Sequence, residues 1–252
     1  MKFVNFYDDK EKIITYGIVE NDKARKIEGG IFENYQITNK SYLLSEIKIL
    51  PPCMPSKLVC VGLNYKDHAE EVKMKLPDKP LLFIKPNTTI IGQNEYIIYP
   101  GQSNRVDYEA ELAIIMKKDA KNITVSDAKD FIFGYTCAND ITARDLQLKD
   151  GQWTRAKSFD TFCPLGPFLV TDIDPANLDI RLFVNNELKQ NSNTNQMIFG
   201  VCQIISYISE IMTLLAGDVV LTGTPDGIGN LNKGDEVIVS IDNIGELRNF
   251  VK

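Results

Sequence analysis

The chain has 252 residues, of which 44% are hydrophobic and 25% charged, as in an ordinary globular protein with one large core and a small accessory domain. Its formal net charge of −6 argues against nucleic acid as the main partner, because phosphate binding requires a basic surface. No uninterrupted apolar run approaches the roughly 20 residues of a membrane helix. The acidic start, MKFVNFYDDKEK, is not that of a signal peptide. We therefore expect a cytoplasmic protein.

The cysteines are odd in number, widely scattered and without a C-x-x-C pair: Cys53, Cys60, Cys137, Cys163 and Cys202. This usage is typical of buried free thiols in a reducing compartment. A zinc site or a thiolate nucleophile would require neighbouring histidines. The chain has only one histidine, so neither is expected.

In chain order, the strand-like units KFVNFYD, ITYGIVEND and KARKIEGGIF come first, separated by turn residues. They predict a small β-rich N-terminal domain over residues 1–53. The proline-rich segment ILPPCMPSK marks the boundary with a second domain over residues 54–252. KLVCVGLNY then predicts a strand and a turn, and KDHAEEVKMK a helix that Pro77 ends. PLLFIKP and EYIIYP predict two further strands.

The second half of the chain is again mostly β. Thr124 with Asp127 resembles a capping box, which predicts a helix start, and YTCANDIT follows as a strand. PLGPFLVT, DIRLFVNNELKQ with its Asn-Asn turn, DVVLTGTPDGIG and DEVIVSIDNIGELRNFV predict strands and hairpins. One amphipathic helix is indicated by apolar residues at positions 201, 204, 205, 208, 211 and 212. The predicted class is α+β, β-dominated, because regular βαβ alternation is missing.

Two carboxylates interrupt the apolar stretch RVDYEAELAIIM at Glu109 and Glu111. Residues i and i+2 of a strand share a face, about 7 Å apart by the strand rise. Buried together and unpaired they would repel each other at high cost, which a divalent cation such as Mg²⁺, Mn²⁺ or Ca²⁺ would relieve. The alternative is a solvated strand face. Asp140, at the end of another apolar strand, is a candidate third ligand or else an N-cap or turn residue.

Other polar residues stand where they could act on a substrate. His68 and Glu71 are i, i+3 neighbours if KDHAEE is helical, which would orient the imidazole as a general base. Lys85 and Lys157 lie in apolar or aromatic surroundings, where an ammonium can bind an oxyanion. The turn LTGTPDGIG could hold a carboxylate on its backbone N–H groups. Each feature also has a plain structural explanation as surface charge or turn.

These segments, in this order, resemble the fumarylacetoacetate hydrolase family. The likeness is to its shorter members, which include acylpyruvate hydrolases, oxaloacetate decarboxylases and hydroxy-dienedioate isomerases. The matching blocks, spread over residues 60 to 229, are VGLNYKDHAEE, PLLFIKP, VDYEAELAIIM, GYTCANDITARDLQ, WTRAKSFDTFCPLGP and AGDVVLTGTPDGIG. Six ordered blocks are far more specific than any one of them.

The resemblance implies a homodimer with a mixed β-sandwich roll and a small N-terminal domain. It implies that Glu109, Glu111 and Asp140 hold one Mg²⁺ or Mn²⁺, for which Ca²⁺ can substitute in a crystal. The long members of the family have an additional aspartate ligand upstream, for which this chain offers no match, so we expect three protein ligands plus waters. The positions that correspond to the lining of the family's substrate pocket are Lys85, Arg144, Gln147 and Thr224.

The resemblance also implies a reaction on a small 2-oxo acid. The first expectation is hydrolysis of the C–C bond of a 2,4-dioxo acid such as an acylpyruvate. In it the pair of His68 and Glu71 activates water, and Lys157 contacts the substrate near the metal. Isomerisation or decarboxylation of 2-oxo or 2-hydroxy-dienoic dicarboxylates is the alternative. A Schiff-base enzyme that uses Lys157, and a non-catalytic binding protein, are rival interpretations.

Overall fold

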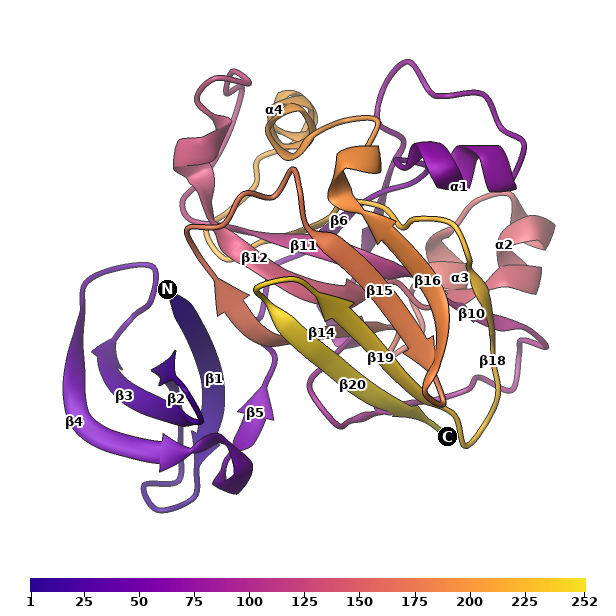
Figure 1. The fold of residues 1–252 in the computed structure, drawn as a ribbon. Coiled ribbons are helices and arrows are strands. Elements are labelled where there is room, and N and C mark those ends of the chain that lie inside the picture. The colour runs from indigo at the N-terminus through magenta and orange to yellow at the C-terminus, as the bar shows by residue number, and fades with distance from the viewer.

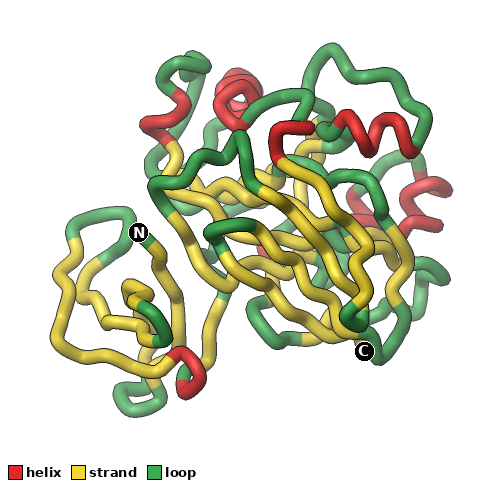
Figure 2. Tube along the Cα trace, viewed as in Figure 1, coloured by secondary structure: helices red, strands yellow, loops and turns green.

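The computed structural model describes all residues 1–252 and is built mainly of strands (Figures 1 and 2). Five strands form the small N-terminal unit seen at the lower left of Figure 1: β1 (Lys2–Asp8), β2 (Ile13–Glu20), β3 (Lys23–Gly29), β4 (Tyr35–Leu43) and β5 (Lys48–Leu50), with a short 3-10 helix at Leu44–Glu46. The three strands predicted in this region are confirmed as β1, β2 and β3.

The N-terminal strands continue into the main sheet of the molecule through β1. The start of β1 pairs with the end of β14, Lys2 opposite Val170 and Phe3 opposite Leu169. The resulting 12-stranded sheet is mixed and runs on from β1. Its further strands are β14 (Cys163–Val170), β12 (Ile132–Asn139), β11 (Ala110–Met116), β17 (Val219–Leu221), β6 (Leu58–Val61) and β7 (Leu82–Lys85), with β8 (Ile90–Ile91) beside β14.

A second sheet lies against this one and encloses the core (Figure 1). Its strands, in order, are β16 (Glu187–Asn193), β15 (Asp179–Val184), β19 (Glu236–Ile241), β20 (Gly245–Val251) and β9 (Tyr96–Ile97). Apolar side chains from β11, such as Leu112 and Ile114, share one buried cluster with Leu182 and Val239 of this sheet. Such face-to-face burial of alternating side chains is the main stabilising contact between two sheets. A small third sheet consists of β13 (Thr142–Ala143), β10 (Val106–Tyr108) and β18 (Gly229–Leu231).

The helices are few and short: α1 (Lys66–Glu71), α2 (Arg144–Asp150), α3 (Thr154–Lys157) and α4 (Val201–Ile211), with 3-10 helices at Asn87–Thr89, Ala128–Phe131 and Thr194–Gln196. The predicted amphipathic helix is confirmed as α4, which is the longest, with 11 residues. No helix is therefore long enough to span a bilayer. All five cysteines are free, and four of them are buried.

Two helix predictions were wrong. The capping-box residues Thr124 and Asp127 do hydrogen-bond each other, but only a 3-10 turn over Ala128–Phe131 follows. The helix expected to run to Pro77 ends at Glu71, because the left-handed backbone of Lys73, with φ of 53°, cannot continue it.

The stretch RVDYEAELAIIM is not one strand. β10 ends at Tyr108 and β11 begins at Ala110, because the two halves pair with different sheets. Glu109 lies at the break, where its backbone N–H donates to the Asn139 side chain (2.9 Å) instead of to a strand ladder. The Asn-Asn turn of the β15–β16 hairpin is as predicted. Asn185 and Asn186 both have positive φ, 50° and 65°, as a type I′ turn requires.

One buried carboxylate fastens the segment that leads from the N-terminal strands into β6. Asp218 accepts hydrogen bonds from the Ser56 N–H (3.0 Å), the Ser56 hydroxyl (2.7 Å) and the Leu215 N–H (2.8 Å), and it pairs with the Lys57 ammonium. Burial opposes its ionisation, but these hydrogen bonds outweigh burial, so the pKa of Asp218 lies below its usual value. The contact fixes β6 beside β17.

We expect Asp218→Asn to lower the free energy of unfolding by about 3 kcal/mol at neutral pH, because it breaks an ion pair whose carboxylate is fully buried and leaves the half-buried Lys57 ammonium without its partner. A carboxylate with a lowered pKa stabilises the fold above its unfolded pKa, and the contribution is lost as the pH falls. The difference in Tm between the variant and wild type should therefore shrink below about pH 4. Thermal denaturation across pH checks this, with exposed Asp9→Asn as the control. Equal Tm values at neutral pH would contradict it.

Candidate metal centre and active site

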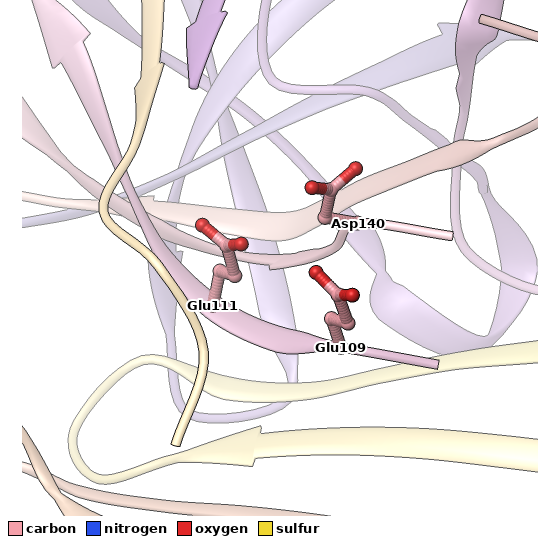
Figure 3. A group of neighbouring side chains, drawn as sticks. All are labelled: Glu109, Glu111 and Asp140. Atoms are coloured by element: carbon pink, nitrogen blue, oxygen red, sulfur yellow. The ribbon is translucent and has the colours of Figure 1, made fainter. Parts of the chain in front are cut away.

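Three carboxylates converge in the interior of the large domain (Figure 3). Glu109 lies between β10 and β11, Glu111 is in β11, and Asp140 follows β12, the neighbour of β11. One oxygen from each lies within 4.8 Å of the others. Glu109 is 6% exposed, and Glu111 and Asp140 are each 1% exposed, which excludes the solvated strand face. Asp140 is not an N-cap either, because α2 begins at Arg144.

Cationic side chains from three elements surround two of these carboxylates. The Lys157 ammonium bridges them, 2.8 Å from Glu109 Oε2 and 2.5 Å from Asp140 Oδ2. Lys85, at the end of β7 and fully buried, donates to the other oxygen of Asp140 and to the Ile141 carbonyl (3.2 Å). Arg144 pairs with Glu109. Burial alone would lower the pKa of Lys157, but Asp140 and Glu109 outweigh burial and raise it, so the ammonium form is favoured.

Glu111 differs from its neighbours because no cationic side chain contacts it. Its one hydrogen bond comes from the Gly223 N–H, 2.6 Å from Oε2. Burial, followed by the charges of Asp140 and Glu109, raises the pKa of Glu111 well above its usual value. The pKa of Glu109 is instead lowered to about 2, because Lys157 and Arg144 outweigh its burial. A positive group beside Glu111 would therefore favour the ionised form of this carboxyl.

The donor set fits a hard divalent cation. Three carboxylate oxygens from neighbouring strands are the ligands that Mg²⁺ and Mn²⁺ prefer, and they leave coordination positions for water or substrate. The ionised form of Glu111 is disfavoured because no positive side chain contacts it, and a cation bound there would favour that form. Glu109, Glu111 and Asp140 are thus the residues that would hold the metal.

The remaining predicted residues lie on α1, on α2 and in the turn after β17. His68 and Glu71 are together on α1, with His68 Nδ1 2.8 Å from Glu71 Oε2. Arg144 donates to Gln147 (2.6 Å) one helical turn further along α2. Thr224 lies in the turn after β17, which also provides Gly223 to Glu111.

The turn of residues 223–227 contacts both the acid cluster, at Glu111, and the pair of His68 and Glu71, at Glu71. Its first N–H, from Gly223, donates to Glu111, and its last, from Gly227, donates to Glu71 Oε1 (3.1 Å). Gly227 has φ of 86°, and a Cβ there would lie 2.3 Å from the Lys189 carbonyl oxygen. Glycine is therefore required at this position, where the turn packs against the backbone of β16.

Two buried supports of the site escaped the sequence analysis. Asp107 is fully buried and accepts from Arg105 and from Arg144 Nε (both 2.9 Å), so it orients the arginine that contacts Glu109. Asn64 donates to the Thr222 carbonyl (2.7 Å) and accepts from the Phe199 N–H (2.9 Å). A polar residue in a short strand or turn gives no sequence signal of such long-range contacts. Asn64 does fall inside the block VGLNYKDHAEE, which could have marked it.

Comparison with known proteins identifies the family of this chain. Residues 57–252 match the family described as fumarylacetoacetate (FAA) hydrolase C-terminal, and residues 1–52 match the family described as Rv2993c-like, N-terminal. The chain belongs to the fumarylacetoacetate hydrolase family. The resemblance predicted from the ordered blocks is therefore confirmed, and the β-dominated fold agrees with that of its structural neighbours.

Several relatives and solved structures match most of the chain. A protein of Archaeoglobus fulgidus is 53% identical over 219 residues, 87% of this chain and 86% of that protein. The mitochondrial oxaloacetate tautomerase Fahd2a of Rattus norvegicus is 44% identical over 82% of this chain and 70% of its own length. The crystal structure of a 2-hydroxyhepta-2,4-diene-1,7-dioate isomerase from Mycobacterium marinum has a TM-score of 0.93 and 41% identity, covering 100% of this chain and 98% of that one.

We expect Glu111→Gln to abolish the stabilisation of the fold by Mg²⁺ without destabilising the metal-free protein. In wild type, Mg²⁺ at a hundredfold excess over its Kd should raise the free energy of unfolding by about 2.7 kcal/mol. The variant should lose this increase, yet in EDTA its Tm should equal or exceed that of wild type, because a repelled carboxyl has gone. Melting curves with EDTA and with Mg²⁺ check both points, with exposed Glu70→Gln as the control. The same Mg²⁺ shift in the variant and in wild type would contradict the ligand role.

We expect Gly227→Ala to lower the free energy of unfolding by about 1 to 3 kcal/mol, since it forces a positive φ on alanine against a carbonyl oxygen. Thermal denaturation measures the loss. Gly101→Ala is the matched control, because no atom lies within 4 Å of the added Cβ. A Tm for Gly227→Ala as high as that of the control would show that the turn relaxes freely.

Proposed function

We propose that this chain is a divalent-metal-dependent enzyme that forms and protonates the enolate of a small 2-oxo acid. The observation that carries the proposal is the buried triad of Glu109, Glu111 and Asp140, with the Lys157 ammonium beside two of its members. A bound Mg²⁺ or Mn²⁺ would supply Lewis acidity, polarising the 2-oxo group and favouring its enolate.

The side chains of the site provide the rest of the chemistry. The Lys157 ammonium is held in place by two carboxylates and can donate to an oxygen on which negative charge develops. Arg144 pairs with Asp107, donates to Gln147 Oε1 and pairs with Glu109, so its guanidinium is held beside the acid cluster. These groups suit a ligand with several anionic oxygens.

The pair of His68 and Glu71 is the candidate proton-transfer group. Glu71 accepts from the imidazole through one oxygen and from the Gly227 N–H through the other, so its position is fixed on both sides. If Nδ1 carries the proton, Nε2 is left as the base. On a bound 2-oxo acid such a base can move a proton between carbon and oxygen, or take one from water.

Isomerisation between keto and enol forms is the reaction we place first. It is supported by the names of the relatives, an oxaloacetate tautomerase and a hydroxyhepta-dienedioate isomerase. Hydrolysis of an acylpyruvate, which the sequence placed first, is the second candidate, because the same pair could activate water. A Schiff base at Lys157 is disfavoured, because that reaction needs a neutral amine and this one is paired with two carboxylates.

An activity panel tests the proposal. Enol–keto conversion of oxaloacetate is followed by the loss of enol absorbance, and cleavage of acylpyruvates by coupled detection of pyruvate. We expect turnover that EDTA abolishes and Mg²⁺ restores, with isomerisation the faster reaction. Faster acylpyruvate cleavage would favour the second candidate instead, and no turnover of any 2-oxo acid would contradict both.

We expect His68→Ala to lower kcat by about 10²- to 10⁴-fold, the usual contribution of a general acid or base. The variant should keep the Mg²⁺-dependent shift in Tm, because His68 is not among the ligand residues. Glu70→Ala on the same helix, exposed and without a side-chain hydrogen bond, is the control. Full activity of His68→Ala with metal bound would exclude this role.

A further inference from the structure

A single buried glutamine joins the second sheet to the acidic site. Gln190 is on β16, a strand whose other residues are exposed or half-buried, yet Gln190 itself is only 1% exposed. Its amide lies between two backbone segments. One is Ala110, which stands between Glu109 and Glu111, and the other is the turn after β17. Burying an amide is costly unless both ends are hydrogen-bonded, and here both are.

The contacts of Gln190 fix which end of its amide faces which partner. The Ala110 N–H can only donate, so the group 2.9 Å away must be the carbonyl Oε1. The amino group Nε2 therefore faces the turn. It donates to Thr224 Oγ1 (2.9 Å), the Pro225 carbonyl (3.0 Å) and the Asp226 carbonyl (3.2 Å).

This orientation determines what the Thr224 hydroxyl can do. Because Nε2 can only donate, Thr224 Oγ1 must accept, and its own proton points to a different partner. The hydroxyl donates to no group of the chain, although Thr224 is only 4% exposed. The preceding residue, Gly223, donates its N–H to Glu111, so the hydroxyl belongs to the residue next to one that contacts the acid cluster.

We infer that Gln190 is a positioning residue, which holds the Thr224 hydroxyl as a hydrogen-bond donor to an anionic oxygen of the bound 2-oxo acid. The inference rests on the proposed ligand class and deepens it, because it assigns a direction to one contact. The hydrogen bond from the Ala110 N–H fixes the Gln190 amide, and through it the Thr224 hydroxyl, relative to the backbone between Glu109 and Glu111. The Gln190 amide accepts from Ala110 at one end and donates to Thr224 at the other.

A double-mutant cycle on binding tests the inference. The probe is oxalate, a stable analogue of a 2-oxo acid enolate, titrated calorimetrically into the full chain with Mg²⁺. Thr224→Val removes the hydroxyl at constant shape and should weaken oxalate binding about 10- to 100-fold, the value of a hydrogen bond to a charged group. Gln190→Met should weaken it by a similar factor, and the double variant should bind no more weakly than Thr224→Val alone.

If the double variant weakened oxalate binding by the product of the two single factors, the inference would be overturned, because Gln190 would then act independently of the hydroxyl. Asn191→Met, on the exposed face of the same strand, is the matched control and should bind oxalate as wild type does. If Gln190→Met fails to fold, Gln190→Glu replaces it, since it keeps the acceptor for Ala110 and loses the donor to Thr224. Thr224→Ser should retain binding, whereas wild-type affinity in Thr224→Val would also overturn the inference.

The two proposals fail in different ways. Oxalate binding that depends on Thr224 and Gln190, in a protein that turns over no 2-oxo acid, would remove the proposed reaction and leave the positioning role intact. Turnover of oxaloacetate that is indifferent to Thr224→Val would do the reverse. Wild-type protein that binds no oxalate in the presence of Mg²⁺ would overturn the positioning role directly.

Discussion

The repulsion among three buried carboxylates is the interaction on which the surrounding structure depends. Glu109, Glu111 and Asp140 place oxygens within 4.8 Å of one another and away from water. At that distance, and with little solvent to screen them, like charges cost several kcal/mol at an effective dielectric constant of about 20. Such a cluster persists only if positive charge is brought to it. Two of the three acids receive that charge from lysine and arginine side chains, and the third does not.

The fold meets this requirement by breaking one strand. At Glu109 the chain leaves the small sheet of β10 and enters the large sheet as β11, and Asn139 accepts the N–H that the break releases. At the break, Glu109 pairs with Lys157 and Arg144. The same crossing point exposes the Ala110 N–H to Gln190 of the second sheet. The position of the acids and the meeting of the sheets are therefore one structural feature.

The sequence could predict the components of this site but not their connections. The spacing of Glu109 and Glu111 and the place of Asp140 after an apolar strand indicated a cation site, because these are local patterns. Lys85 pairs with Asp140 because β7 lies beside β6. That contact depends on residues far apart in the chain, so local patterns could not predict it. The predicted length of the helix that became α1 was wrong because the positive φ of Lys73 overrode the helix propensity of the segment. The homodimer and the cytoplasmic location stay predictions.

The turn of residues 223–227 gives the two chemical groups of the site a common support. Its Gly223 N–H is the single hydrogen bond to the acid that lacks a cation, and its Gly227 N–H holds the acid that orients His68. Both glycines have positive φ, so side chains at either position would strain the turn. A shift of this short segment would move Glu111 and Glu71 together. The proposed metal ligand and the proposed proton-transfer pair are thus connected through five residues of backbone, to which Gln190 of the opposite sheet donates hydrogen bonds.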